Sequence, residues 1–311
     1  MAKSVLDLIG KTPVVELRSL SPRRAIRLFA KLEGQNPSGS IKDRIVAYML
    51  QRARDDGRLR PGQEIVEATT GNTGIALALL GRQLGHPVKV VVPDNAFGDV
   101  VQALKALEAE IESVPATLGI KSAIDVAQEI ARRDAAFLLD QFGSSDNPRC
   151  HYETTAPELL SQLPDLDAFV CGLGTGGTAM GIGRRLKEQN PAVKVIVAEP
   201  HPGHNLQGMR SLAEGNIPPI LDLRGLDAKI VVSSANAFRG VRELLRREGI
   251  LAGLSSGAVL YAALKWAQRI ERGRIVMLFA DSGWKYLNSP AYSLDRSLED
   301  EAHTFDEVLW W

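Results

Sequence analysis

A lysine at the start of a predicted helix is the first residue whose position suggests chemistry. Lys42 follows a turn-forming stretch at residues 36–40, and Ile41 and Ile45 begin a helical spacing of apolar residues. Ser40 is the predicted N-cap. The positive end of the helix dipole disfavours an ammonium group in the first turn, so we expect a lowered pKa for Lys42. An easily deprotonated lysine suits Schiff-base chemistry; the alternative is an ordinary solvated lysine.

A second polar loop, at residues 68–74, joins a predicted strand to a predicted helix. Its polar side chains and its first glycine are Thr69, Thr70, Gly71, Asn72 and Thr73. Glycine lets the backbone approach a ligand, and donors at a helix N-terminus attract anions. The loop therefore predicts a carboxylate site, although a simple strand-to-helix cap is the alternative.

A third loop, at residues 172–178, is rich in glycine and also follows a predicted strand. Its glycines and hydroxyl residues are Gly172, Gly174, Thr175, Gly176, Gly177 and Thr178. Backbone amides in such a loop can hold a phosphate. The spacing also matches the dinucleotide pattern G-x-G-x-x-G, with Glu199 about where a ribose-binding acid would stand. A nicotinamide-dependent dehydrogenase is therefore an alternative, but the additional glycine and the hydroxyls favour a compact phosphate.

A fourth loop, at residues 253–257, places two adjacent serines before another predicted helix. We expect one of Ser255 and Ser256 to cap this helix and the other to face a cleft.

Alternating strands and helices position all four loops. Strands are predicted at residues 14–17, 26–32, 64–67, 88–92, 110–114, 136–139, 168–171, 193–199, 230–232 and 275–279, with helices in the segments between most of them. This rhythm predicts an α/β fold: two three-layer α/β/α domains with mostly parallel sheets. The breaker-rich residues 143–148 suggest domains at 1–145 and 146–311, with the first ~35 residues able to pack on the second domain. Ligands in such folds bind at the carboxyl ends of the strands.

The composition fits a soluble protein that binds small molecules. The chain has 311 residues, is 45% hydrophobic and balances 37 basic against 37 acidic residues, so neither a nucleic-acid nor a membrane partner is expected. Two cysteines, Cys150 and Cys171, are too few for a disulfide framework and favour a reducing compartment. No apolar run is long enough for a membrane span and no signal peptide is evident, so we expect a cytoplasmic protein.

The four loops, in this order, resemble those of the cysteine synthase family of pyridoxal-phosphate enzymes, which share fold type II with the tryptophan synthase β subunit. The resemblance covers nearly the whole chain. It rests on Asn36-Pro-Ser-Gly-Ser-Ile-Lys42-Asp43-Arg44, Thr69-Thr70-Gly71-Asn72-Thr73-Gly74, Gly174-Thr-Gly-Gly-Thr178 and Ser255-Ser256-Gly257. Further segments resemble the B-type enzymes: Glu67-Ala68-Thr69, Pro93-Asp94-Asn95, Leu139-Asp140-Gln141-Phe142, and Asp146-Asn147-Pro148 followed by His151-Tyr152.

The resemblance implies a role for each matching residue. Lys42 would be the catalytic residue, bonded covalently to pyridoxal 5'-phosphate, and Asn72 would contact the ring oxygen of this cofactor. Its phosphate would be held by Gly174, Thr175, Gly176, Gly177 and Thr178, and its ring nitrogen by Ser255. The substrate carboxylate would be held by Thr69, Thr70, Gly71, Thr73 and Gln141. No metal is implied.

The implied reaction is a β-replacement that makes L-cysteine in a homodimeric enzyme. The freed Lys42 amine would remove the α proton of a serine derivative, and a sulfur nucleophile would replace its leaving group. Cystathionine β-synthase and serine/threonine dehydratase are alternatives within the same chemistry. The sequence leaves open the acetyl or phosphoryl leaving group, the sulfide or thiosulfate-type donor, and any sulfur-carrier or acetyltransferase partner.

Three positions depart from the common family pattern. Lys11 stands where the family usually has asparagine before Thr-Pro, and its consequence is not evident from the sequence. Arg210 stands where B-type enzymes carry arginine, so we expect it to bind an anionic leaving group or sulfur donor; a surface arginine is the alternative. The chain ends in Trp310-Trp311, which we expect to pack on a partner subunit, near the cleft or on their own domain.

Overall fold

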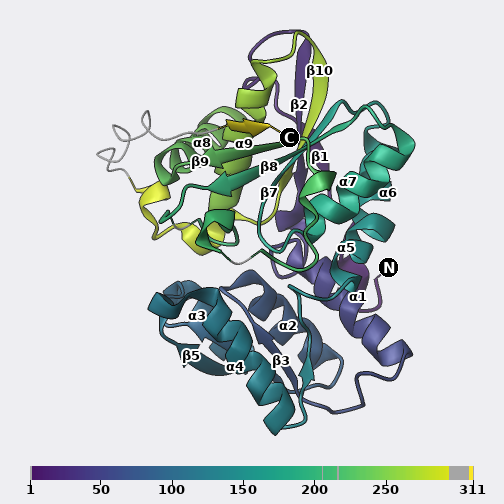
Figure 1. The fold of residues 1–311 in the computed structure, drawn as a ribbon, viewed down its shortest axis with the longest axis vertical. Coiled ribbons are helices and arrows are strands. Elements are labelled where there is room, and N and C mark those ends of the chain that lie inside the picture. Colours follow the sequence, from purple (N-terminus) through teal and green to yellow (C-terminus); the bar gives the residue numbers. More distant parts are fainter. Residues whose placement is uncertain (1, 205, 216, 294–307, 311) are drawn as a thin grey trace.

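Two β-sheets form the core of the computed structural model, which describes residues 2–204, 206–215, 217–293 and 308–310 (Figure 1). The larger sheet has seven strands in the order β1-β2-β10-β7-β8-β9-β11. Their bounds are β1 Val14–Glu16, β2 Ile26–Leu32, β7 Ala168–Gly172, β8 Lys194–Pro200, β9 Ala228–Val232, β10 Gly273–Phe279 and β11 Val308–Trp310. The five inner strands are parallel, whereas β1 and β11 pair antiparallel at the two edges.

Helices cover both faces of this sheet. The bounds are α6 Ala156–Gln162 and α7 Gly177–Gln189 on one face, and α8 Ser234–Glu248 and α9 Leu254–Ala267 on the other. Helix α5 Asp146–Cys150 and a π-helical turn, His151–Thr155, precede α6; α5 packs between α7 and the helix at Lys42–Asp55. Strand β7 shows why both faces are covered, because its residues alternate between two cores. Phe169 packs with Leu159 and Ile182 under α6 and α7, whereas Val170 packs with Ala258 under α9. Both faces of an inner parallel strand are therefore apolar.

The smaller sheet has four parallel strands in the order β5-β4-β3-β6. Its elements are β3 Ile65–Ala68, β4 Val88–Pro93, β5 Glu110–Val114 and β6 Phe137–Leu138, with the helices α1 Lys42–Asp55, α2 Asn72–Gln83, α3 Gly98–Ala106 and α4 Gly119–Arg133. Apolar residues of α1, α2 and α3 fill one core with β3 and β4. Ala123 and Ala127 of α4 pack on Val66 and Val91 at the opposite face. The predicted α/β fold with mostly parallel sheets is thus confirmed.

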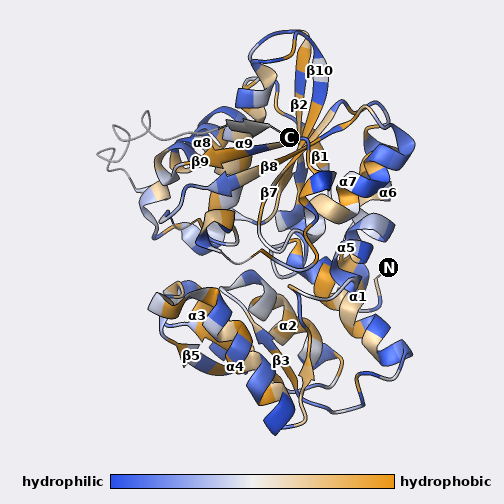
Figure 2. Ribbon diagram, in the orientation of Figure 1, coloured by the Kyte–Doolittle hydropathy of each residue, from blue (hydrophilic) through white to orange (hydrophobic). Residues whose placement is uncertain are grey.

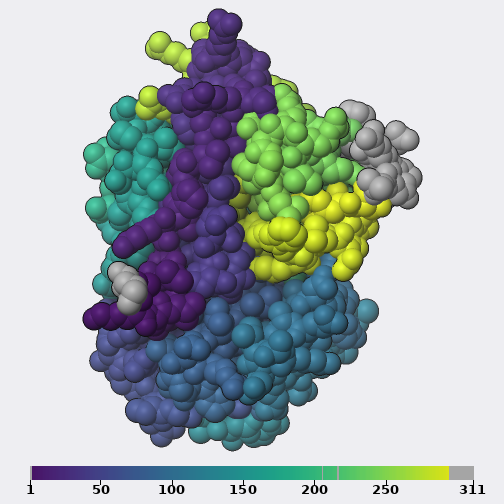
Figure 3. Space-filling model, turned by 180° about the vertical axis from the view of Figure 1, so that it is seen from behind, coloured from purple at the N-terminus to yellow at the C-terminus, as the bar shows by residue number. Residues whose placement is uncertain are grey.

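The N-terminal chain belongs to the larger sheet. Strand β2 lies parallel to β10, with Ile26 opposite Gly273 and Leu32 opposite Phe279. Seen from behind, this part of the chain runs as a purple stripe over the molecule toward the smaller sheet (Figure 3). The division at residue 145 stays a prediction.

The hydropathy of the ribbon follows the same layers: the strands are largely apolar, and the helices combine apolar with polar residues (Figure 2). Among the described residues, none of the helices combines the length and apolarity that crossing a membrane requires.

Candidate active site

One cavity collects residues from three of the four predicted loops. It has a volume of about 220 Å³, and a smaller recess of about 50 Å³ adjoins it. Both are lined by Lys42, Asn72, Gly174, Thr175, Gln207, Gly208 and Met209. The larger cavity adds Thr69, Thr70, Thr73, Gln141 and Arg210, and the recess adds Gly176, Thr178 and Ser255. Strands β3, β7 and β10 end here, so the site lies at carboxyl ends of parallel strands, as predicted.

Lys42 is the first residue of α1, as the sequence predicted, but the predicted cap is displaced by one residue. Ile41 occupies the N-cap position, and the Ser40 hydroxyl accepts a hydrogen bond from the Lys42 N–H at 3.3 Å. Ser40 instead forms an isolated antiparallel bridge with Asp281, just beyond the end of β10. The Ile41 N–H donates to the Ala280 carbonyl at 2.8 Å in the same contact. Residues 36–42, which we call the lysine loop, are therefore held by the larger sheet.

The lowered pKa predicted for Lys42 is present, with a different main cause. Burial lowers the pKa of the Lys42 amine to about 8, and the nearby guanidinium of Arg210 acts in the same direction. The carboxyl groups of Glu67 and Asp281 oppose this shift. The prediction from the helix dipole was incomplete, because it could not include the closed surroundings of the amine.

The second loop meets Gln141 across the end of β3. The Thr73 hydroxyl donates to Gln141 Oε1 at 2.7 Å, and Gln141 Nε2 donates to the Ala68 carbonyl at 2.9 Å. The Thr69 hydroxyl accepts the Gly71 N–H at 3.0 Å. The proton of the Thr69 hydroxyl is not used in these contacts, whereas the Gln141 side chain also hydrogen-bonds Glu67. This corner therefore presents a hydroxyl donor to an anion such as a carboxylate.

Asn72 has a fixed orientation within the same loop. Its Nδ2 donates to Asp281 at 2.7 Å, and its Oδ1 accepts from the Lys285 amine. Asp281 is buried and also accepts from the Tyr286 hydroxyl. These contacts join the smaller sheet to the larger one beside Lys42.

The third loop has the shape of an anion cradle at the start of α7. Gly176 has a φ of +88°, which favours glycine. A Cβ atom on Gly174 would lie 2.5 Å from the Gly208 carbonyl oxygen, so only glycine fits there. The Thr175 hydroxyl accepts the Gly177 N–H at 3.3 Å. Unpaired N–H groups of the first turn of this 13-residue helix attract anions such as phosphate.

The two serines do not divide their roles as predicted. Gly253 holds the N-cap position of α9, and both serines lie within the first turn. The prediction of a capping serine was therefore wrong. Ser255 lines the recess, whereas the Ser256 hydroxyl is buried without a hydrogen-bond partner in the described part of the chain.

Arg210 lies in the cavity wall rather than on the open surface. Its guanidinium stacks on the Phe142 ring with 4.2 Å between the guanidinium carbon and the ring centroid. One terminal nitrogen is buried and has no hydrogen-bond partner among the described residues. Burial lowers the pKa of Arg210 to about 10, opposed by Glu214, so the group remains charged at neutral pH. A buried cation with a free donor is suited to an anionic ligand.

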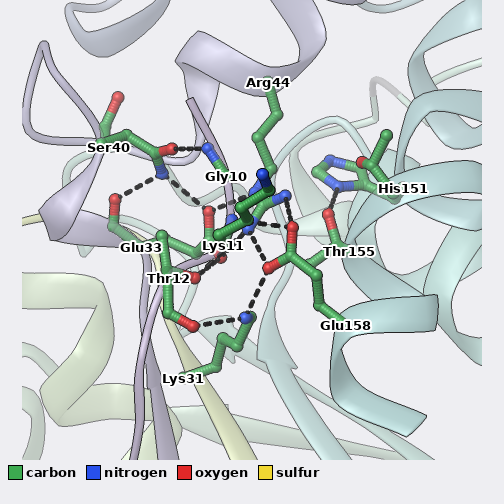
Figure 4. A network of polar contacts seen from close by, with 12 residues as sticks. Gly10, Lys11, Thr12, Lys31, Glu33, Ser40, Arg44, His151, Thr155 and Glu158 are labelled. Atoms are coloured by element: carbon green, nitrogen blue, oxygen red, sulfur yellow. Dashed lines mark hydrogen bonds and ion pairs between the residues drawn. The ribbon is translucent and has the colours of Figure 1, made fainter. Parts of the chain in front are cut away.

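A buried charge network behind the lysine loop was missed by the sequence analysis (Figure 4). Arg44 of α1 forms ion pairs with Glu33 at 2.6 Å and with Glu158 of α6 at 2.8 Å. Lys31 of β2 pairs with Glu158 at 2.7 Å. Lys31, Glu33 and Arg44 are buried, although charged residues suggest an exposed position. Only their reciprocal charges could have indicated the pairing.

Lys11 lies at the edge of this charge network. Its backbone N–H donates to Glu158 Oε1 at 2.9 Å, and its φ of +51° lies in the left-handed region. Asparagine tolerates this conformation better than lysine does. The conformation gives a physical reason for the asparagine that the resemblance led us to expect there.

Two other contributors to the site were not predicted as site residues. Gln207 comes from an irregular stretch, and its Nε2 donates to the Thr70 carbonyl. Glu67 is buried near Lys42, and burial together with the neighbouring Asp140 raises the pKa of Glu67 to about 8.

Glu199 does not reach toward the glycine loop as a ribose-binding acid would. It forms an ion pair with Lys229 at 2.9 Å and accepts a hydrogen bond from the Ser211 hydroxyl at 3.0 Å. The acidic residue required by the dinucleotide interpretation is therefore engaged elsewhere.

Comparisons with known proteins agree with this geometry. The family described as "Pyridoxal-phosphate dependent enzyme" matches residues 5–281. The chain is 38% identical to cysteine synthase B of Pseudomonas aeruginosa over 290 residues, which is 93% of this chain and 97% of the relative. It is 39% identical to a Staphylococcus aureus cysteine synthase over 305 residues, 94% of this chain and 97% of the relative.

Solved structures are also similar. A hydrogen sulfide-producing enzyme from Fusobacterium nucleatum has a TM-score of 0.88 at 37% identity and covers 92% of this chain and 100% of its own. O-ureido-L-serine synthase has a TM-score of 0.90 at 33% identity and covers 97% of this chain and 98% of its own. A cysteine synthase from Entamoeba histolytica has a TM-score of 0.88 at 31% identity and covers 96% of this chain and 94% of its own.

Proposed function

Because the chain belongs to the pyridoxal-phosphate dependent enzyme family, we propose that it is a cysteine synthase of the B type. The reaction is a β-replacement on O-acetyl-L-serine or O-phospho-L-serine, with a sulfide or thiosulfate-type donor, to give L-cysteine or S-sulfocysteine. The observation that supports it best is that one cavity is lined by a lysine with a lowered pKa, an anion cradle and Arg210, which has one nitrogen without a partner among the described residues.

The residues present fit the family's cofactor, pyridoxal 5'-phosphate. The glycines of the cradle let its loop fold tightly, because Cβ atoms there would meet Gly208, Leu221 or Asn147. The recess places Ser255 and Asn72 on its walls. The phosphate would be held by Gly174, Thr175, Gly176, Gly177 and Thr178. Asn72 would contact the ring oxygen, Ser255 the ring nitrogen and Lys42 the reactive carbon.

Lys42 is proposed to carry the proton in this reaction. When bound, pyridoxal phosphate supplies an electron sink that stabilises negative charge at the α carbon of an amino acid. The Lys42 amine removes the α proton and later returns it. Ser255 is uncharged, so it does not keep the ring nitrogen protonated, which favours elimination and replacement over transamination.

The remaining residues orient the substrate. Donors from Thr69, Thr70, Gly71, Thr73 and Gln141 would hold its carboxylate. Arg210 would hold the anionic group at the other end, either the departing phosphate or an oxyanion sulfur donor. Two fixed ends align the β carbon and its leaving group with the Lys42 amine.

The alternatives are less well supported. The alternative of a nicotinamide-dependent dehydrogenase was wrong, because the chain belongs to a family that uses pyridoxal phosphate. The curated relatives described above are cysteine synthases, which favours this activity over cystathionine β-synthase or a serine/threonine dehydratase. A cytoplasmic homodimer completes the proposal, with domains at residues 1–145 and 146–311 and with the first ~35 residues packed on the second domain. The free, buried Cys150 and Cys171 are consistent with a reducing compartment.

The visible spectrum of the purified protein tests this function. We expect a yellow protein whose absorbance shifts when O-acetyl-L-serine or O-phospho-L-serine is added, and which forms L-cysteine once sulfide follows. Lys42→Ala is the control and should show neither the shift nor the product. A colourless wild-type protein that binds NAD instead of pyridoxal phosphate would overturn the proposal.

A further inference from the structure

The segment that connects the two sheets packs unusually closely on the helix of the phosphate cradle. A Cβ atom on Gly177 would lie 2.0 Å from Asn147 Oδ1, and one on Gly181 would lie 2.1 Å from the Pro148 carbonyl oxygen. The two glycines are four residues apart, so they share one face of α7. Any side chain at either position would separate α5 from α7. The spacing therefore brings polar side chains of residues 146–155 directly behind the cradle.

Asn147 uses this closeness to contact two parts of the site at once. Its side chain is completely buried. The Nδ2 group donates to the Gln141 carbonyl at 2.7 Å and to the Thr175 hydroxyl oxygen at 3.1 Å. Gln141 is proposed to bind the substrate carboxylate, and Thr175 to bind the cofactor phosphate. One amide group therefore spans both binding regions.

The Thr175 hydroxyl shows what this contact does. A hydroxyl has two acceptor positions and one proton. The Thr175 oxygen accepts from Asn147 Nδ2 and from the Gly177 N–H, so both acceptor positions are used. The proton then remains free to donate to an anion in the cradle. Without Asn147, the hydroxyl could turn and offer a lone pair to the phosphate, which would repel it.

His151 supports the cradle in a more limited way. Its Nε2 lies 3.3 Å from the Thr178 hydroxyl. Its Nδ1 lies 3.0 Å from the Thr155 hydroxyl (Figure 4). The contact with Thr155 is buried and the contact with Thr178 is partly buried. Neither contact involves Gln141. His151 therefore contacts the cradle without a connection to the carboxylate region.

We propose that Asn147 is a positioning residue that couples the phosphate cradle to the substrate-carboxylate site through Thr175 and Gln141. This inference rests on the proposed function, because it needs both ligands to bind where that function puts them. It predicts that one substitution weakens two chemically different ligands, neither of which contacts Asn147.

Two binding constants test the coupling. The apoprotein is titrated with pyridoxal phosphate, and the loaded protein is titrated with L-alanine, which has the carboxylate but no leaving group; both are followed by absorbance. Asn147→Ala should weaken each ligand roughly tenfold, the effect of losing one buried hydrogen bond. Asn147→Ser, which is too short to reach both partners, should act in the same direction and provides a second variant if alanine prevents folding.

The control variants replace His151. In His151→Asn, the new amide takes the place of Nδ1 and retains only the hydrogen bond to Thr155. In His151→Gln, the new amide takes the place of Nε2 and retains the hydrogen bond to Thr178. We expect His151→Asn to weaken pyridoxal phosphate without changing the L-alanine constant, and His151→Gln to restore phosphate binding. A Thr175→Val, Asn147→Ala double variant should bind the cofactor no more weakly than Thr175→Val alone, because the two side chains act as a unit.

The outcomes separate the inference from the function on which it rests. If the wild-type protein binds both ligands, and a folded Asn147→Ala variant keeps both constants or loses only the cofactor constant, the coupling is wrong. If the wild-type apoprotein takes up no pyridoxal phosphate, the proposed function fails and the inference fails with it. Apoprotein unfolding curves identify a variant whose only change is stability, and that result also overturns the coupling.

Discussion

The Lys42 amine is partly deprotonated near neutral pH because burial lowers its pKa to about 8. A protonated amine cannot attack an aldehyde, so its reactivity must fall as the pH drops below this value. The charge of Arg210 helps to set the pKa, while Glu67 and Asp281 limit the shift.

We therefore predict that capture of pyridoxal phosphate by the apoprotein becomes faster as the pH rises through about 8 and then levels off. Below the pKa, the rate should fall about tenfold for each pH unit, because the neutral amine fraction falls by that factor. Stopped-flow absorbance between pH 6 and pH 10, which are about two units either side of the pKa, measures it. Lys42→Ala should show no covalent capture of pyridoxal phosphate. A capture rate that rises only near the ordinary pKa of lysine would contradict the role of burial.

Arg210 leads to a prediction about substrate choice. Arg210→Ala should lower kcat/KM for O-phospho-L-serine or thiosulfate by roughly 10- to 100-fold, because a charged hydrogen bond is lost. The value with O-acetyl-L-serine and sulfide should change little. Arg210→Lys is the matched control and should recover part of the loss, since it keeps the charge without the planar donors. Equal losses with both substrate pairs would contradict this role.

At the residue scale, the sequence was informative where a side chain type is unusual for its position. Lys42 at a helix start and the threonines of the second loop could be selected from their types alone. Gln207 and Asp281 could not, because nothing in their neighbourhood in the sequence indicates that the chain folds back to place them beside Thr70 and Asn72.

At the scale of elements, the buried charges behind the lysine loop tie β2, α1 and α6 together (Figure 4). Burial alone would raise the pKa of Glu158, but hydrogen bonds from Arg44 and Lys31 outweigh it and lower the pKa to about 2. The folded state therefore holds this carboxylate ionised more firmly than the unfolded chain does.

A carboxylate whose pKa is lowered on folding stabilises the fold above its unfolded pKa and loses that contribution as the pH falls toward the folded value. We predict that stability falls between about pH 4.5 and pH 2 and that Glu158→Gln flattens this part of the curve. Urea unfolding at several pH values measures it. Glu153→Gln, on the same helical stretch but exposed, should leave most of the slope in place, and an unchanged slope in Glu158→Gln would contradict the assignment.

The turn at Lys11 provides a test of backbone strain. Its φ of +51° costs a lysine more than an asparagine. Lys11→Asn should raise the free energy of unfolding by about 0.5–1 kcal/mol, or Tm by roughly 1–3 °C, while leaving kcat/KM unchanged. Thermal unfolding checks this. Lys11→Val, a β-branched residue, should destabilise the same turn, and equal Tm values for all three proteins would remove strain as an explanation.

Most elements could be predicted to within a few residues because apolar periodicity reports burial directly. The start of α9 could not, since Gly253 takes the cap although two serines follow it. A Cβ atom on Gly253 would lie 1.8 Å from Asp281 Oδ1, so a tertiary contact decides which residue stands there. The capping preference of serine is weaker than that steric requirement.

At the scale of the molecule, the sequence showed two α/β units but not the order of strands in either sheet. That order depends on pairing between segments far apart in the chain, as β2 with β10 and β9 with β11. The C-terminal tail is an example. Trp310 ends β11, which pairs with β9 of the same chain, whereas Trp311 lies outside the described residues.

Removal of residues 308–311 should therefore affect stability rather than catalysis. The edge of β9 would lose its backbone partner, at a cost of about 1–2 kcal/mol, and would be open to pairing with other chains. We expect a lower Tm and more aggregation with unchanged kcat/KM. Trp311→Ala keeps the β11 backbone and should resemble the wild type. A loss of kcat at unchanged Tm would show instead that the tail acts at the active site.

The pairing of β2 with β10 has a consequence for the time course of biosynthesis. The hairpin of β1 and β2 leaves the ribosome early, but its inner neighbour begins only at Gly273. At ~5–20 residues per second, the nascent chain carries this apolar strand edge without its partner for on the order of tens of seconds. The smaller sheet, made of β3 to β6, is complete long before. Lys42, whose loop contacts both sheets, is thus held in place only when synthesis is nearly finished.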